Sequence, residues 1–90
     1  MTLLDVLLIL RDRLQIAYEK NQRSDGELLM IIFDRLTEIS YAQDNRALTG
    51  ILVDLTDTAR DVAMGVRGKA VMTKIEDIQA VFATTSREAS

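Results

Sequence analysis

The sequence predicts an all-α fold, a small bundle of three to four amphipathic helices that is completed by dimerisation. Apolar residues recur at intervals of three and four, as on the buried face of a helix. Proline is absent from the 90 residues, so nothing forces a break inside a helix. We expect residues 1–85 to form a single helical domain and residues 86–90 to form a frayed tail.

The first helix is predicted to run from Thr2 to Lys20, with Thr2 as its N-terminal cap. Its buried stripe consists of Leu3, Leu7, Leu10, Leu14 and Ala17. More apolar residues flank this stripe, so the helix is apolar around most of its girth. Such a helix needs neighbours on more than one side.

A polar loop over residues 21–26 precedes the second helix, which is predicted to run from Gly26 to Gln43. Ser24 or Asp25 is its candidate cap. Residues 28–33 are continuously apolar, which is also typical of a short buried strand. The helical spacing around them favours a helix.

The third helix is predicted to follow Asp44 and Asn45, its candidate caps, and to end near Met64. Because no glycine or proline lies between Glu27 and Thr49, one continuous rod formed by the second and third helices is the alternative. We prefer two helices, since a helix of about 40 residues is rare against a mean of about 12.

The stretch GVRGKA, over residues 65–70, has two interpretations. A phosphate-binding loop of the GxxxxGK[ST] type would need a glycine where Ala63 stands and a hydroxyl where Ala70 stands. We therefore interpret the stretch as a joint, in which Gly65 ends the third helix in the left-handed region.

The fourth helix is predicted to begin at Thr73, which forms a capping box with Glu76. Its predicted buried face consists of Ile75, Ile78 and Phe82. The polar run that starts at residue 83 is expected to fray.

The composition removes most catalytic machinery. Histidine and cysteine are both absent, which excludes the commonest general base, a thiolate nucleophile and the usual zinc ligands. None of the four serines stands in a Gly-x-Ser-x-Gly context. We expect a protein that is not an enzyme and that holds no cofactor and no metal.

Charge is unevenly distributed along an acidic chain of net charge −3. Residues 24–45 carry five acidic residues and one basic residue, and residues 66–74 carry three basic residues and no acidic one. Nucleic-acid binding needs clustered basic residues, so no nucleic-acid partner is expected. The candidate acidic surface consists of Asp34, Glu38, Asp54, Asp57 and Asp61, and the candidate basic loop of Arg67 and Lys69.

A cytoplasmic protein without a membrane partner is expected. The apolar run over residues 3–10 is far shorter than the roughly 20 residues of a membrane span, and Asp5 interrupts it. No basic stretch precedes this run, as a signal peptide would require.

The first two helices carry more apolar surface than a monomeric bundle needs. Residues 3–10 and 28–33 exceed the usual fraction of about three apolar positions in seven. Because monomers rarely expose a large apolar patch, we expect a two-fold homodimer. The candidate interface residues are Leu4, Leu8, Met30, Ile31 and Phe33.

These features favour a non-enzymatic protein–protein interaction module, such as an adaptor, a chaperone or an antitoxin-like inhibitor. Apolar helix faces with an acidic rim would bind its protein partner. Two alternatives remain. Asp54, Asp57 and Asp61 share one helix face, as in a magnesium-dependent nucleotide phosphohydrolase that holds the ion through carboxylates and substrate phosphates. The second alternative is a structural subunit of a phage or secretion assembly, which would show the same sequence features as the interaction module.

Overall fold

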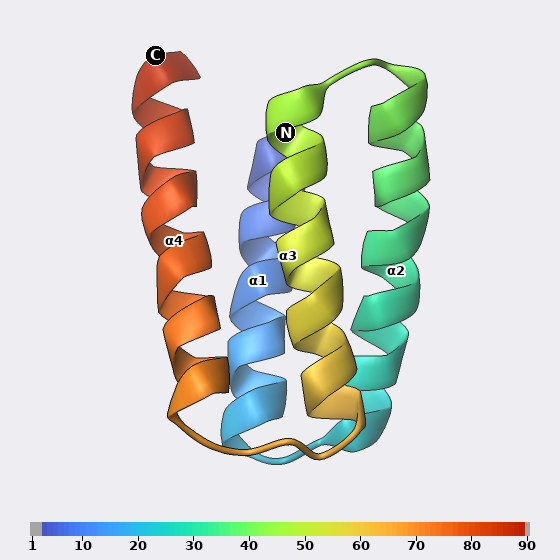
Figure 1. Ribbon diagram of the computed structural model, residues 1–90, viewed down its shortest axis with the longest axis vertical. Coiled ribbons are helices and arrows are strands. Elements are labelled where there is room, and N and C mark those ends of the chain that lie inside the picture. The colour runs from blue at the N-terminus through green and yellow to red at the C-terminus, as the bar shows by residue number, and fades with distance from the viewer. Residues whose placement is uncertain (1–2, 90) are drawn as a thin grey trace.

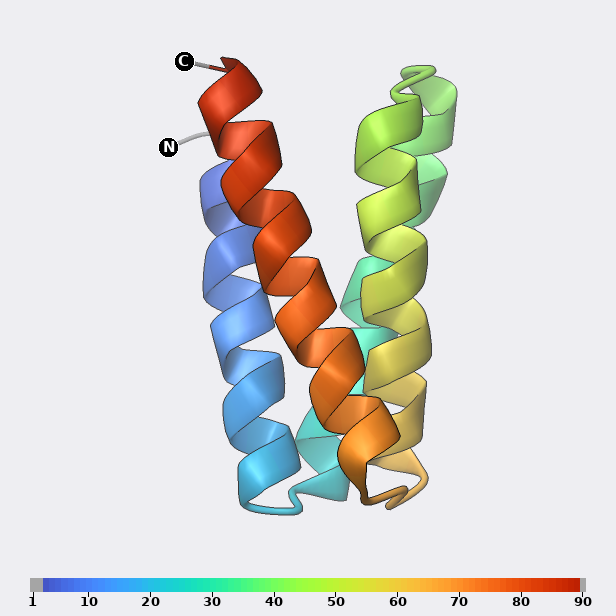
Figure 2. The same ribbon diagram turned by 60° about the vertical axis from the view of Figure 1, so that its left-hand side comes forward.

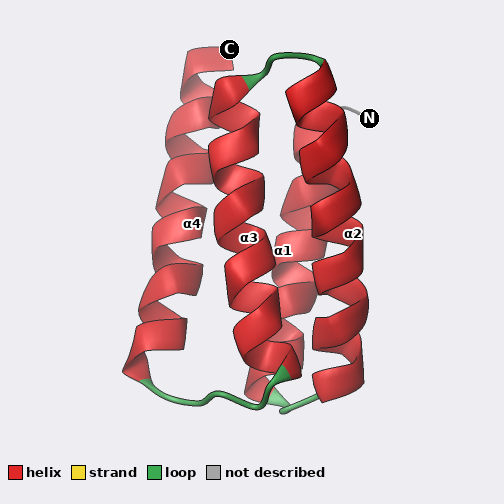
Figure 3. Cartoon of the chain, turned by 45° about the vertical axis from the view of Figure 1, so that its right-hand side comes forward, coloured by secondary structure: helices red, strands yellow, loops and turns green. Residues whose placement is uncertain are grey.

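The computed structural model describes the backbone of residues 3–89 and the side chains of residues 5–78 and 80. Within that range the chain forms four helices and no strand, which confirms the all-α bundle (Figure 1). The helices are α1 (Leu3–Glu19), α2 (Arg23–Ala42), α3 (Arg46–Ala63) and α4 (Lys69–Ala89). Short turns make consecutive helices antiparallel, so both ends of the chain lie at one end of the bundle (Figures 1 and 3).

Helices α1, α2 and α3 end in the same C-terminal motif. After α2, the amide of Asp44 donates to the carbonyl of Tyr41, and the amide of Asn45 donates to the carbonyl of Ser40, both at 3.0 Å. The motif needs one residue with positive φ after the helix. Asn21 and Asp44 have φ of 53°, and Gly65 has φ of 76°. A left-handed aspartate therefore separates α2 from α3, and the continuous-rod alternative is wrong.

The N-terminal ends of the helices agree with the predictions only in part. Asn45 caps α3, because its side chain accepts a hydrogen bond from the amide of Leu48 at 3.2 Å. The predicted caps of α2 are wrong: the helix begins at Arg23, so Ser24 and Asp25 lie in its first turn. The candidate cap of α1 at Thr2 lies outside the described residues.

The predicted start of α4 is also wrong. The helix begins at Lys69, directly after Gly68 with its φ of 136°, so Thr73 lies inside the helix and forms no capping box. The turn at Gly68 has already started the helix one turn before the threonine. At the other end the backbone stays helical to Ala89, and the side chain of Phe82 lies outside the described part of the chain.

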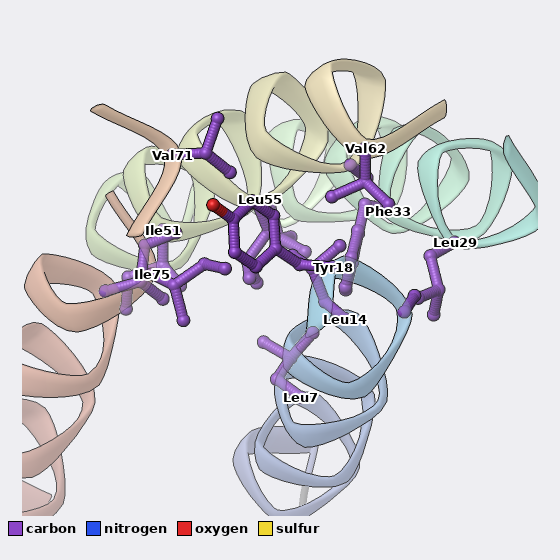
Figure 4. Packing of buried hydrophobic residues seen from close by; sticks show 14 residues of the cluster. Leu7, Leu14, Tyr18, Leu29, Phe33, Ile51, Leu55, Val62, Val71 and Ile75 are labelled. Carbon is purple, nitrogen blue, oxygen red and sulfur yellow. The ribbon is translucent and has the colours of Figure 1, made fainter. Parts of the chain in front are cut away.

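The hydrophobic core draws side chains from all four helices, and α3 contributes the most (Figure 4). The core residues are Leu7, Leu14, Ala17, Tyr18, Leu29, Phe33, Ile51, Leu52, Leu55, Ala59, Val62, Val71, Ile75 and Ile78. Helix α3 contacts each of the other three helices, and its contact with α2 is the most extensive in the described bundle. Helix α4 leans away from α3 toward its C-terminal end (Figure 2).

Helices α2 and α3 approach each other closely at both ends of their contact. At one end, a Cβ atom on Gly26 would lie only 2.8 Å from the backbone nitrogen of Ala63. At the other end, the buried hydroxyls of Ser40 and Thr49 are 2.6 Å apart and form a hydrogen bond between the helices. The absence of a side chain at Gly26 therefore permits the packing, and the hydroxyl pair fixes its register.

The two glycines inside helices should respond oppositely to alanine. Gly50 lies exposed in α3, and a Cβ atom there would meet nothing within 4 Å. Gly50→Ala should raise the free energy of unfolding by about 0.5–1 kcal/mol, because alanine loses less backbone entropy. Gly26→Ala should lower it by about 1–3 kcal/mol, because the added methyl group overpacks the helix contact. Urea denaturation measures both, and a neutral Gly26→Ala would contradict the close approach.

Candidate binding surfaces

The α3–α4 loop is a structural joint that fastens to the end of α1. The Tyr18 hydroxyl donates to the Gly68 carbonyl at 3.1 Å and accepts from the Gly68 amide at 3.2 Å. The Arg67 guanidinium donates to the backbone carbonyl of Tyr18. It also lies over the aromatic ring of Tyr18, 4.4 Å from the ring centroid. We call these contacts the Tyr18–Arg67 clasp. The positive charge of Arg67 also suits the negative C-terminal end of α1.

The clasp gives half of the predicted basic loop a structural role. The Arg67 guanidinium is engaged by Tyr18 of the same chain, whereas Lys69 lies exposed at the first position of α4. Gly65 adopts the left-handed conformation that the joint interpretation predicts.

Removing the hydroxyl of Tyr18 tests the clasp. Tyr18→Phe keeps the buried ring but leaves the backbone groups of Gly68 without their partner, so the free energy of unfolding should fall by about 1–2 kcal/mol. Tyr41→Phe is the matched control, because Tyr41 is 67% exposed and should change stability by less than about 0.5 kcal/mol. Equal effects in thermal or urea denaturation would contradict the clasp.

The predicted acidic residues of α3 lie on the side of that helix that faces α4. Asp54 and Asp57 border a shallow hollow of about 170 Å³ together with Lys74 and Asp77 of α4. Lys74 Nζ lies 2.9 Å from Asp61 Oδ2. The hydrogen bond to Asp61 and the charge of that carboxylate raise the pKa of Lys74 above its ordinary value of 10.5, and Asp57 and Asp54 add to the effect.

The remaining acidic candidates lie elsewhere. Asp34 and Glu38 of α2 line a different groove, beside Thr56 and Arg60. Among the residues whose side chains are described, no three acidic, histidine or cysteine residues are grouped so that they could hold a metal ion.

The ion pair between Lys74 and Asp61 predicts a specific pH dependence. A raised pKa in the folded state means that the pair stabilises the fold fully below pH 10.5 and loses this effect as the pH rises through the folded pKa of Lys74. Asp61→Asn should return the pKa of Lys74 toward 10.5, as measured by NMR titration of the lysine side chain. An unchanged pKa in the variant would contradict the pairing.

The groove between α2 and α3 brings together four predicted site residues. Its volume is about 380 Å³, and its lining includes Met30, Ile31, Asp34 and Glu38. Met30 is partly buried and packs against the core, whereas Ile31 is 51% exposed. We call this surface the α2–α3 groove; Met30 and Ile31 form its apolar floor, and its rim carries Asp34 and Glu38 together with the basic residues Arg35 and Arg60.

Other candidate interface residues lie outside this groove. Phe33 is wrong as an interface residue, because its side chain is fully buried in the core. Residues 29 and 33, four apart, point inward, whereas residues 28 and 31 of the same apolar run point outward. Leu8 is partly buried against the core, and the side chain of Leu4 lies outside the described residues.

Sequence reasoning missed a second apolar surface, which lies between α1 and α2. Its exposed members between the helices are Ile16 and Leu28, at 40% and 57%, and Ile9 and Ile39, at 50% and 49%, lie further along the same sides of α1 and α2. A groove of about 270 Å³ between the two helices contains Arg13, Asp25 and Ile32. We call this surface the α1–α2 face. A signal was present, because Ile9 and Ile16 are seven residues apart and form a second stripe beside the buried one.

In comparisons with known proteins, no family model, no curated protein and no solved structure matches the chain. Within residues 3–89, none of the helices has the length and apolarity that crossing a membrane requires. On the geometry above, the α2–α3 groove and the α1–α2 face are the candidate binding surfaces.

Proposed function

We propose that this protein is a non-enzymatic protein–protein interaction module that binds a basic, amphipathic helical segment of a partner protein in the α2–α3 groove. It would act as an adaptor, a chaperone or an inhibitor, each of which works by occupying a surface of its partner. The observation that carries the proposal is the exposed side chain of Ile31, which lines the groove with Met30 and with the carboxylates of Asp34 and Glu38.

The spacing of the groove residues suits a helix. Met30, Asp34 and Glu38 are four residues apart and follow one side of α2 for about 12 Å, or roughly two helical turns. A partner helix lying along the groove would place its own basic residues at the same spacing. Its apolar residues would then cover the floor, as in other helix-in-groove complexes.

The charges of the groove favour a basic segment. Arg35 contacts Glu38 at 3.5 Å, and Arg60 contacts Asp57 at 3.7 Å, so both arginines and Glu38 are already engaged in ion pairs within the chain. Asp34 has no ion-pair partner among the described side chains. The surrounding segment carries a surplus of acidic residues, which would attract a basic partner and speed its association.

We also propose that the module is a cytoplasmic homodimer. Exposed aliphatic side chains remain on the α1–α2 face, which the groove does not include, and this second surface supports self-association. The short apolar run interrupted by Asp5 supports the location.

Placing a charge on the floor of the groove tests the proposed function. The tagged wild-type chain should retain one stoichiometric partner from a lysate of its source cells at low salt and lose it at high salt, because salt screens the rim charges. Ile31→Lys should fold normally, since this side chain is half exposed, and should weaken binding at least about tenfold.

Val53→Lys is the matched control, since Val53 is 40% exposed on α3 but lies outside the groove. This variant should keep the partner. Retention of the partner by Ile31→Lys, or a complex that is insensitive to salt, would contradict the proposal.

A further inference from the structure

We propose that the α1–α2 face binds a second copy of this chain, forming a two-fold dimer in which Arg13 of each protomer pairs with Asp25 of the other. This inference deepens the homodimer part of the proposed function and rests on it. It does not depend on the α2–α3 groove, which lies on the other side of α2.

The apolar content of the face provides the attraction. Ile9 and Ile16, seven residues apart, share one side of α1, and Leu28 and Ile39, eleven residues apart, share one side of α2. All four are exposed by 40% or more, although aliphatic side chains of this size are usually buried. Covering them with a second copy would remove them from water without any change of the bundle itself.

The proposed dimer needs a contact of ordinary size. A standard interface buries about 800 Å² on each partner. This is about one seventh of the 5738 Å² of accessible surface of the chain. Helix α1 is about 25 Å long, and a contact along most of α1 and α2 would supply an area of this order.

The charges of the face select a second copy over an unrelated partner. Arg13 lies on α1 and Asp25 on α2; both are exposed, and both line the same groove. Neither forms an ion pair with another described side chain. The face therefore carries one charge of each sign, on different helices, and is electrostatically complementary to itself.

Two-fold symmetry converts this arrangement into two identical ion pairs. A two-fold axis that runs along the bundle places α1 of one protomer against α2 of its partner. Arg13 and Asp25 line one groove and so lie at a similar level of the bundle, and this operation brings each arginine to the aspartate of the other chain. Leu28 of each protomer then covers the groove of the other.

Sedimentation velocity on the full chain tests the location of the interface. The wild type should be a dimer at micromolar concentration. Leu28→Lys should raise the dimer dissociation constant at least about tenfold while circular dichroism shows an unchanged helical fold. Ile31→Lys, an equally exposed position in the α2–α3 groove, should leave the dimer intact. A monomeric wild type, or a Leu28→Lys variant that dimerises normally, would overturn the proposal.

A charge exchange tests the ion pairs. Arg13→Asp and Asp25→Arg should each weaken the homodimer at least about tenfold, because each places like charges opposite one another. An equimolar mixture of the two variants should form a heterodimer again. In that heterodimer the introduced aspartate meets the introduced arginine, and the two native residues meet at the symmetry-related position.

The mixture of the two variants distinguishes an ion pair between protomers from an ion pair within one chain. A second variant chain cannot restore a pair that forms within a single chain. A mixture that stays monomeric, or single variants that dimerise like the wild type, would overturn the assigned pair. A monomeric wild type that still captures a partner through Ile31 would overturn the homodimer and this interface, and would leave the proposed interaction module standing.

Discussion

The packing of α2 against α3 is the interaction on which the rest of the molecule depends. The two helices approach so closely at Gly26 that no side chain fits there, and the Ser40–Thr49 hydroxyl pair joins them at the other end. Helix α3 supplies five of the fourteen core side chains that the structure describes, and it contacts every other helix. Helices α1 and α4 therefore pack onto the α2–α3 hairpin and complete the core. The Tyr18–Arg67 clasp joins the end of α1 to the start of α4.

The same packing decides which surfaces remain for binding. One side of α2 packs against α3 and the core. The apolar residues of α2 that lie outside this contact are therefore exposed on its two flanks. Ile31 emerges in the α2–α3 groove, and Leu28 emerges on the α1–α2 face. A chain of this length buries only about 60–65% of its unfolded surface, so leftover aliphatic side chains are expected. Their grouping on two defined surfaces, each bordered by charges, is what favours binding as the function.

The fold class and the helix content were predictable because they depend on local signals. Helical spacing and the absence of proline identify the helices, and Asn45 caps α3 as its residue type suggests. The start of α4 was not predictable in this way. It follows Gly68, which is held by Tyr18, a residue 50 positions earlier in the chain. The break between α2 and α3 was predicted at Asp44 and Asn45, although the positive φ of Asp44 that forms it has no glycine to signal it in the sequence.

The binding surfaces were only partly predictable for a similar reason. Within the apolar run over residues 28–33, the helix that packs against each residue decides whether it is buried, so Phe33 and Ile31 look alike in the sequence and differ in the structure. The acidic residues of α2 and α3 carry the same charge but lie on different surfaces. Asp34 lines the α2–α3 groove, whereas Asp54 borders the hollow between α3 and α4. Only the arrangement of the helices reveals these differences.

Native-state hydrogen exchange of the full chain tests the central role of the α2–α3 hairpin most directly. The slowest-exchanging amides should lie in α2 and α3 and open only with global unfolding, whereas those of α4 should open at lower free energy, because α4 shares less contact with the bundle. Amides of α4 as protected as those of α2 and α3, or an α2–α3 hairpin that opens first, would contradict this account.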